Sequence, residues 1–428
     1  MYTNIAKKTV RAYSVNIKNI IYFFMPSIIG LMINLFTFPI FSRNLSSYDF
    51  SVMGYFEAIG QIFLPIMNLS FFSYYMKDFF SRSEEENRSV RATLVSFLLV
   101  VNIGIVLLGL ALIMLYFNFA DVTFPLFPFG ILSLGAIYFS IFIAFLGVEY
   151  KLKKEGLKFF SLQTANIILP TTFALVLVVV LHLGATGRML GTLLSQFILG
   201  VFALRMMLER VKFDLKIIKG ALAFGFPLIL IALLDIPTTY IDRLILERQN
   251  DVDSFALYNI GRKMSGFLFA LGTAIYQSFE PDFYKYVSEK KTKKFLMIMG
   301  GVFGFLLIIN CTFLIFAEPI ISLLTSNRYT DSYQFANIMI WSNFFLLLSY
   351  ALTIILIVNN KSTLLLYIQL MIAVSGVTIF MLFINYWKFI GASYAMVLIH
   401  FLNCLLLIFF ICLSSWKRRK NQEEEENC

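Results

Sequence analysis

Residues 92–117 read ATLVSFLLVVNIGIVLLGLALIMLYF, a block without a single charged side chain. A helix of about 20 apolar residues crosses the roughly 30 Å hydrocarbon layer of a bilayer, so this block is long enough to span a membrane. Comparable blocks recur along the 428 residues, which are 59% hydrophobic and only 14% charged, with a mean hydropathy of +0.80. Soluble domains carry about 25% charged residues. The sequence therefore predicts an all-α integral membrane protein.

The apolar blocks predict about twelve membrane-spanning helices in two halves of six. We expect the first six at 19–41, 50–76, 92–117, 124–148, 159–181 and 187–208. We expect the second six at 220–246, 255–284, 295–317, 335–358, 364–386 and 390–416. The predicted division is an N-terminal six-helix lobe (1–213), a C-terminal six-helix lobe (214–416) and a charged cytoplasmic tail (417–428).

The basic residues alternate between the two sides of this arrangement. With the N-terminus inside, the inside segments carry 27 of the 35 Lys and Arg residues and the outside segments carry 6. Cytoplasmic loops are enriched in Lys and Arg, so the count predicts a multi-pass protein with both termini in the cytoplasm. The net charge of +10 comes from these loop clusters rather than from one basic face, which argues against a nucleic-acid partner.

Weak internal similarity relates the two halves. Pro26 and Asn34 are eight residues apart, as are Pro227 and Asp235, and other matches share an offset near 200 residues. Two six-helix halves enter the membrane in the same orientation, so this repeat predicts pseudo-symmetric bundles around a central cavity that opens to each side in turn. Pro39, Pro227 and Pro237 are candidate helix breaks at that cavity, although a proline in a membrane helix is also tolerated without function.

Ionisable residues inside apolar blocks are the candidate site. A charge at the centre of a membrane helix costs about 2.5–3.5 kcal/mol on insertion scales, so each one calls for a function or a partner. The candidates are Glu57, Asp235, Asp242, Arg243, Arg262 and Lys263.

Three interpretations of these charges are open. Arg262 and Lys263, with Arg243 and Arg43, can line a site for an anionic head group, because a guanidinium binds two phosphate oxygens at once. Alternatively, Arg262 pairs internally with Asp235 or Glu57. Asp235 and Glu57 are also candidates for a coupling H⁺ or Na⁺. Asp242 and Arg243 lie near the expected outer end of their helix, where side chains can reach water.

Several expected absences narrow the function. The sequence has no phosphate-binding Gly-Lys-Ser/Thr loop, no paired His/Glu metal signature and no Ser/His/Asp arrangement, and it has only two histidines. No loop is long enough for the extramembrane segment expected of a membrane glycosyltransferase or polysaccharide polymerase. We therefore expect neither an enzyme nor a metal or cofactor site, with no catalytic residue.

Several motifs resemble those of bacterial polysaccharide flippases. They are GFPL at 225–228, Asp242-Arg243, ALYNIGRK at 256–263, Pro281, GATG at 184–187, Tyr329 and GASYA at 391–395. These flippases are the O-antigen and capsular-type transporters of the multidrug/oligosaccharidyl-lipid/polysaccharide exporter superfamily. The resemblance extends over the whole chain, but the glycine-rich positions around Arg43 to Gly60 are only partly present.

The resemblance implies a substrate and a direction of transport. The substrate is an oligosaccharide linked to undecaprenyl diphosphate, moved from the cytoplasmic to the outer leaflet of a bacterial cytoplasmic membrane by alternating access. The implied partners are membrane lipids, a coupling ion (H⁺ or Na⁺), a polysaccharide polymerase and chain-length proteins. A cation-coupled drug antiporter of the same superfamily is the first alternative, and a membrane polymerase or glycosyltransferase is the second.

Overall fold

The computed structural model describes residues 2–120, 122–208, 210–359 and 361–426, and within these ranges it is helical, with no strand. Side chains are described for 22–23, 25–120, 122–208, 210–359, 361 and 363–413. Ten of the described helices are long and apolar enough to cross a membrane. One of these ten, Thr363–Leu413, contains two helices that meet at Lys388, and α11 (Val252–Ser288) is a further helix of 37 residues. The described helices confirm the predicted all-α membrane fold.

The chain forms two compact units, Met1–Ala232 and Leu233–Cys428. The first contains α1 Tyr2–Asn44, α2 Ser47–Asn68, α3 Phe71–Lys77, α4 Glu84–Phe119, α5 Phe129–Leu152, α6 Gly156–Leu175, the π-helix Val176–Val180, α7 Gly184–Met207 and most of α8 Leu215–Leu234. The second contains α9 Ile236–Thr239, α10 Ile241–Glu247, α11 Val252–Ser288, α12 Thr292–Leu324, the 3₁₀ turn Thr330–Ser332, α13 Tyr333–Val358 and α14 Ser362–Glu426.

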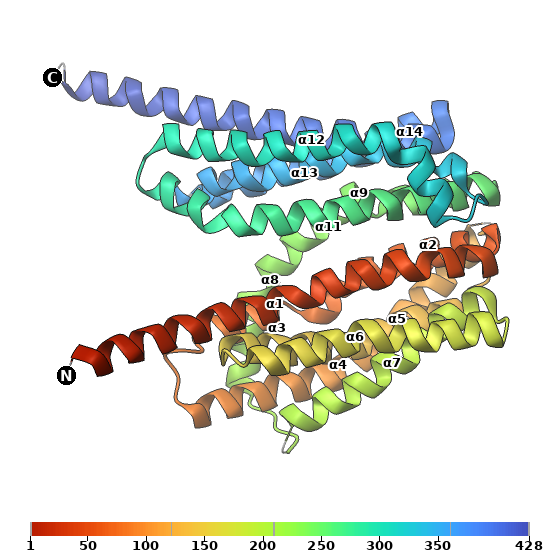
Figure 1. The fold of residues 1–428 in the computed structure, drawn as a ribbon, viewed down its shortest axis with the longest axis horizontal. Helices are drawn as coiled ribbons and strands as arrows, with labels where there is room; N and C mark the ends of the chain where they lie inside the picture. The colour runs from red at the N-terminus through yellow and green to blue at the C-terminus, as the bar shows by residue number, and fades with distance from the viewer. Residues whose placement is uncertain (1, 121, 209, 360, 427–428) are drawn as a thin grey trace. The chain divides into compact units, whose positions relative to one another are not determined.

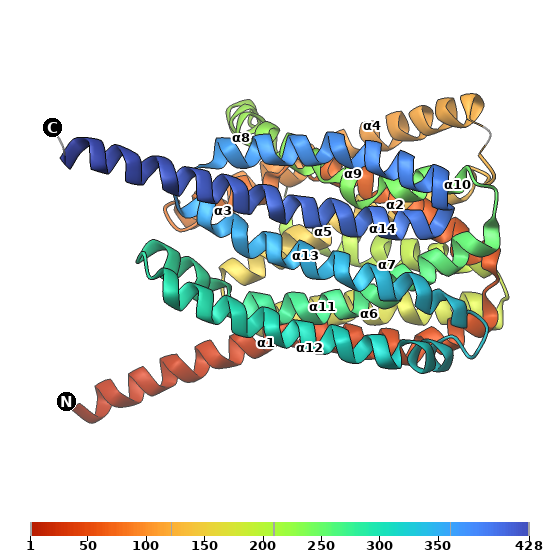
Figure 2. The same ribbon diagram turned by 90° about the horizontal axis from the view of Figure 1, so that it is seen from above.

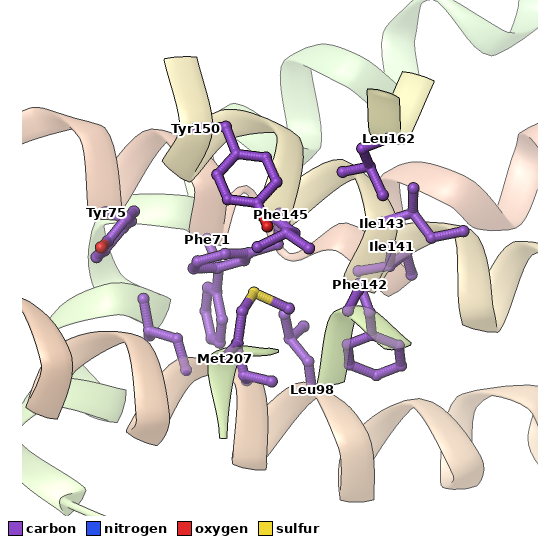
Figure 3. Close-up of a cluster of buried hydrophobic side chains, with 14 of the residues drawn as sticks. Phe71, Tyr75, Leu98, Ile141, Phe142, Ile143, Phe145, Tyr150, Leu162 and Met207 are labelled. Atoms are coloured by element: carbon purple, nitrogen blue, oxygen red, sulfur yellow. The ribbon is translucent and has the colours of Figure 1, made fainter. Parts of the chain in front are cut away.

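In the first unit, α5 and α7 pack along each other, and α6 packs against both α7 and α1 (Figure 1). The interior contains a cluster of large apolar side chains from α3, α4, α5, α6 and α7 (Figure 3). Phe71, Phe142 and Phe145 are fully buried in it, and Tyr75 lies against Phe145 with ring centroids 5.2 Å apart. In lipid, close packing of this kind rather than exclusion of water holds the helices together.

In the second unit, α13 packs against both α11 and α14, and these helices run side by side along the long axis of the bundle (Figure 2). Its buried apolar cluster is centred on Tyr276, Phe283, Phe303 and Leu347. The short helices α9 and α10 lie against the later part of the chain, in α14.

The boundary between the units falls 19 residues later than the expected boundary at 213, because α8 packs into the first unit. Gly225 of α8 lies so close to the α2–α3 turn that a Cβ atom there would overlap the carbonyl oxygen of Leu69. The ring of Phe224 lies 5.9 Å from that of Tyr74, and the ammonium of Lys77 lies 5.2 Å from the Phe224 centroid. These contacts attach α8 to the half of the chain that precedes it.

Several predicted helices differ from those observed. Helix α1 begins at Tyr2, 17 residues before the predicted start at 19. The predicted helix at 50–76 is divided at Leu69 and Ser70, which both have φ near +50°, into α2 and α3. The predicted helix at 220–246 is interrupted between Leu234 and Ile241. The backbone of α14 continues to Glu426, ten residues beyond the expected end at 416 and through most of the predicted tail, while residues 427–428 lie outside the described chain.

Only one of the three candidate proline breaks coincides with a break. Helices α1 and α8 continue through Pro39 and Pro227, so no helix ends there. Membrane helices tolerate proline where nearby side chains bind the freed backbone groups. Pro237 differs, because it lies in the first turn of the four-residue α9, directly after the interruption at Asp235.

Candidate functional site

The interruption of the helix after Leu234 exposes backbone groups inside an apolar block. A proline lacks an N–H, so Pro237 cannot donate the helical hydrogen bond to the preceding turn. The chain forms one short turn, α9, and changes direction again at Tyr240, where φ is −129° and ψ is −18°. Such breaks leave carbonyl oxygens without helical partners, and each needs another donor inside a membrane.

Side chains supply two of these donors. The hydroxyl of Thr238 donates to the Asp235 carbonyl at 2.9 Å. The guanidinium of Arg262, from α11, donates through Nη2 to the Thr239 carbonyl. Arg262 therefore bonds directly to the backbone of the broken helix.

A carboxylate from α10 accepts hydrogen bonds from two side chains of α11. Asp242 Oδ2 accepts hydrogen bonds from Tyr258 Oη and from Arg262 Nη1. Asp242 is fully buried, and 14% of the Arg262 side chain is exposed. Tyr258 and Arg262 are one helical turn apart on the same face, as the i, i+4 spacing predicts. The three side chains tie α11 to α10, and we call Asp242, Tyr258 and Arg262 the polar triad.

The sulfur of Met396 completes this contact from α14. Met396 Sδ lies 3.3 Å from Arg262 Nη1 and 3.5 Å from Tyr258 Oη. One turn further along α14, the His400 side chain is 4% exposed, and its Nδ1 has no hydrogen-bond partner among the described residues. The sequence favours a packing role for this histidine, and the structure places it in the core without a partner for that nitrogen.

The structure places the other candidate residues as follows. Arg243 is buried, with 5% of its surface exposed, in the helix that also carries Asp242. Lys263, Asp235, Arg43 and Glu57 are exposed. Arg43 and Glu57 belong to the first unit and the other three to the second. In the described part of the second unit, the polar triad brings Asp242 and Arg262 together, and Arg243 and Lys263 are their neighbours in sequence.

Two expectations about these charges are corrected. Arg262 pairs with Asp242, whereas the sequence suggested Asp235 or Glu57 as partners. Asp242 and Arg243 do not reach out to water, because both are buried where α10 packs against α14. The interrupted helix folds these two side chains inward, which a straight helix ending at 246 would not do.

The first unit contains a second buried ion pair, which the sequence did not predict. Arg91 of α4 donates through Nη1 to Glu149 of α5, and its Nε donates to the Met207 carbonyl at the end of α7, 3.2 Å away. Lys153 also lies within ion-pair distance, 2.6 Å, of Glu149. Both members of the main pair are buried. Arg91 and Lys153 lie among the basic residues of predicted loops, so the sequence assigned them only to the positive charge of the inner side. The one sequence feature that could have indicated the pair is Glu149, an acidic residue at the end of an apolar block.

Among the described residues no three His, Cys, Asp or Glu side chains lie close enough together to hold a metal ion. What the cluster of the second unit offers chemically is positive charge and hydrogen-bond donors at a break in a membrane helix. Backbone breaks and intramembrane charges together are features of substrate and ion sites in transporters.

Comparison by sequence finds no family model that matches this chain. It likewise finds no match among curated proteins. Comparison of structures does find relatives of the fold. The lipid II flippase MurJ in an inward closed conformation matches with a TM-score of 0.69 and 15% identity, covering 91% of this chain and 87% of MurJ.

Multidrug exporters match over a similar length. A multidrug resistance MATE family transporter of the MOP superfamily, in its inward-facing conformation, matches with a TM-score of 0.64 and 14% identity over 94% of this chain and 99% of its own. The Vibrio cholerae MATE transporter VcmN matches in its bent form with a TM-score of 0.53 and 15% identity, covering 93% of this chain and 97% of that one. The chain is a multi-pass membrane protein with the fold that the MurJ flippase and the MATE transporters share.

Proposed function

We propose that this protein is a transporter that moves undecaprenyl-diphosphate-linked oligosaccharides from the cytoplasmic to the outer leaflet of a bacterial cytoplasmic membrane. The export would supply units for a surface polysaccharide such as O-antigen, capsule or exopolysaccharide. The observation that carries this proposal is the group of basic side chains, Arg243, Arg262 and Lys263, that follow the helix break after Leu234 in the second unit.

The charge of this group suits a diphosphate. Hydrogen bonds to charged groups are each worth about 1.5–3 kcal/mol, so two or three such contacts provide enough affinity to hold an anionic head group. Lys263 is exposed on α11, next in sequence to the partly buried Arg262. Lys263 would bind the head group as a point charge, while Arg262 would add positive potential and fix the broken helix through Asp242 and Thr239.

One of the proteins that share this fold is a lipid flippase, and this supports a lipid-linked substrate. MurJ is described as a lipid II flippase, and a lipid-linked sugar is also the substrate that the GFPL and ALYNIGRK motifs imply here. Alternating access would expose the basic group first to one side of the membrane and then to the other. Arg43, in the first unit, is a further candidate for the head group.

A cation-coupled antiporter of small molecules is the second candidate function. The likeness to MATE transporters and the exposed carboxylate of Asp235 at the helix break favour it. In either case Asp235 and Glu57 are the candidates to carry a coupling H⁺ or Na⁺.

Purified protein in proteoliposomes separates the two functions. The liposomes contain a polyprenyl-diphosphate-linked oligosaccharide, and an added glycosidase cleaves only the sugar that reaches the outer face. We expect cleavage beyond the half initially exposed, and no protein-dependent uptake of a cationic dye. Dye uptake driven by an ion gradient without movement of the lipid-linked sugar would establish the antiporter instead.

A further inference from the structure

The two halves of α14 meet in a sharp elbow. Lys388 has φ of 50° and ψ of −128°, outside any helical conformation. Gly391 lies so close to the preceding helix that a Cβ atom there would overlap the Phe383 carbonyl oxygen and approach Trp387 Cβ to 3.1 Å. The missing side chain allows the chain to reverse direction within a few residues.

An apolar groove opens between the two helices that leave this elbow. It encloses about 400 Å³ and is lined by Phe383, Trp387, Ile390, Tyr394, Val397, Leu398 and Phe401. Phe383 and Trp387 are one turn apart on the first helix. Residues 394, 397, 398 and 401 follow the i, i+3, i+4, i+7 spacing of one face of the second. Seven residues of helix give this face a length of about 10 Å.

The side chains around the elbow are of the types that are common at the interface between the membrane and water. Tyr386, Trp387 and Tyr394 are 74%, 59% and 49% exposed. Tyrosine and tryptophan concentrate where the hydrocarbon meets the head groups. Lys388 is also exposed and makes no ion pair with any acidic side chain that the structure describes. Lys388 itself does not line the groove, but it follows the lining residue Trp387 directly in the chain, at the elbow where the two helices meet. The elbow therefore offers a cation next to the end of an apolar groove.

We propose that this groove binds an anionic phospholipid of the surrounding bilayer, with its phosphate on Lys388 and one acyl chain along Tyr394 to Phe401. The single charge of Lys388 matches the single charge of a phosphodiester. A polyprenyl diphosphate carries more charge than one lysine compensates, so the groove differs from the basic group of α10 and α11. The alternation of Lys and Arg along the chain places Lys388 on the outside, which assigns the lipid to the outer leaflet.

The test measures lipid binding to the full-length protein by native mass spectrometry. Phosphatidylglycerol and phosphatidylcholine with identical acyl chains are added separately. We expect tighter retention of phosphatidylglycerol, weakened about fivefold by Lys388→Gln, the factor that one lysine at an anionic surface contributes. Val397→Trp fills the groove and should also reduce retention. The matched controls are Lys293→Gln, at an exposed lysine at the start of α12, and Leu405→Trp, at an exposed position of α14 outside the groove.

Three results would overturn the proposal. Equal retention of the two phospholipids would show that the charge of the head group does not contribute to binding. Equal effects of the control substitutions would show that the lipid does not bind in this groove. Displacement of phosphatidylglycerol by an equimolar polyprenyl phosphate, in wild type but not in Val397→Trp, would assign the groove to an isoprenoid chain instead. Lys388→Gln and Lys293→Gln change only exposed side chains, so a shared elution volume on gel filtration checks that each variant is folded.

Discussion

Arg262 shows how far residue patterns predict a site. The i, i+4 spacing correctly placed Tyr258 and Arg262 on one face, because the helical repeat alone decides this. Their common partner, Asp242, could not be predicted, since it comes inward only through the two changes of direction at Asp235 and Tyr240. Those changes depend on three-dimensional packing, and the sequence signalled them only through Pro237.

Lys263 and Arg262 should respond differently to removal of their side chains. Lys263→Ala removes an exposed charge, so we expect export to fall about tenfold or more, with the melting temperature nearly unchanged. Lys293→Ala, which removes an exposed lysine of α12, should alter neither quantity. Normal export by a folded Lys263→Ala protein would exclude this residue from head-group binding.

Arg262→Ala should destabilise the protein, because it leaves the buried Asp242 carboxylate without its ion pair. Loss of one partner of a buried pair costs about 3–5 kcal/mol, measurable as a lower melting temperature in detergent. Replacing both members of the pair, with Asp242→Asn and Arg262→Gln, should restore most of this stability and leaves the net charge of the site unchanged. Export should still stay low because the guanidinium, and its hydrogen-bond donors, are gone. If export returned together with stability, Arg262 would act only on the structure.

At the scale of elements, the apolar blocks predicted most helices closely. A membrane helix needs about 20 apolar residues, and this requirement is readable without tertiary information. The positions of the helix breaks were harder to predict from the sequence. Pro39 and Pro227 lie within continuous helices, and of the three candidate prolines only Pro237 lies at an interruption. The predicted gap between the helices at 364–386 and 390–416 coincides with the break in α14 at Lys388.

The packing of α8 on the first unit gives a test at this scale. Gly225→Ala places a methyl group against the Leu69 carbonyl, so we expect a loss of about 1–3 kcal/mol, as for other overpacked sites. Gly300→Ala in α12 is the matched control, because its Cβ would meet nothing within 4 Å. That substitution should leave stability unchanged or raise it by up to about 1 kcal/mol, since alanine is the better helix former. Equal melting temperatures for the two variants would contradict the close approach of α8 to Leu69.

For the whole molecule, the fold class was predictable from the sequence, but the boundary between the two compact units was not. Composition and block length sufficed for an all-α membrane protein, whereas the boundary at Ala232 depends on contacts of Gly225 and Phe224 that no sequence pattern displays. The membrane orientation stays a prediction from the distribution of Lys and Arg.

Cysteine labelling tests that orientation. With the four native cysteines replaced, Lys290→Cys between α11 and α12 should react with an impermeant maleimide only after the cells are permeabilised. Asp331→Cys, between α12 and α13, should react in intact cells. Both positions are exposed in the structure. The opposite labelling pattern would invert the topology and with it the direction of transport.

The most direct test of the central claim is the leaflet in which lipid-linked oligosaccharide accumulates when the protein is deleted. Intact spheroplasts are treated with an impermeant glycosidase, and the protected fraction of the intermediate is measured. We predict that complete oligosaccharide units stay protected on the cytoplasmic side and that surface polymer is lost. Wild-type protein should reverse both effects and Lys263→Ala should not. Complete single units exposed on the outer leaflet, yet not polymerised, would contradict the account and indicate a polymerase.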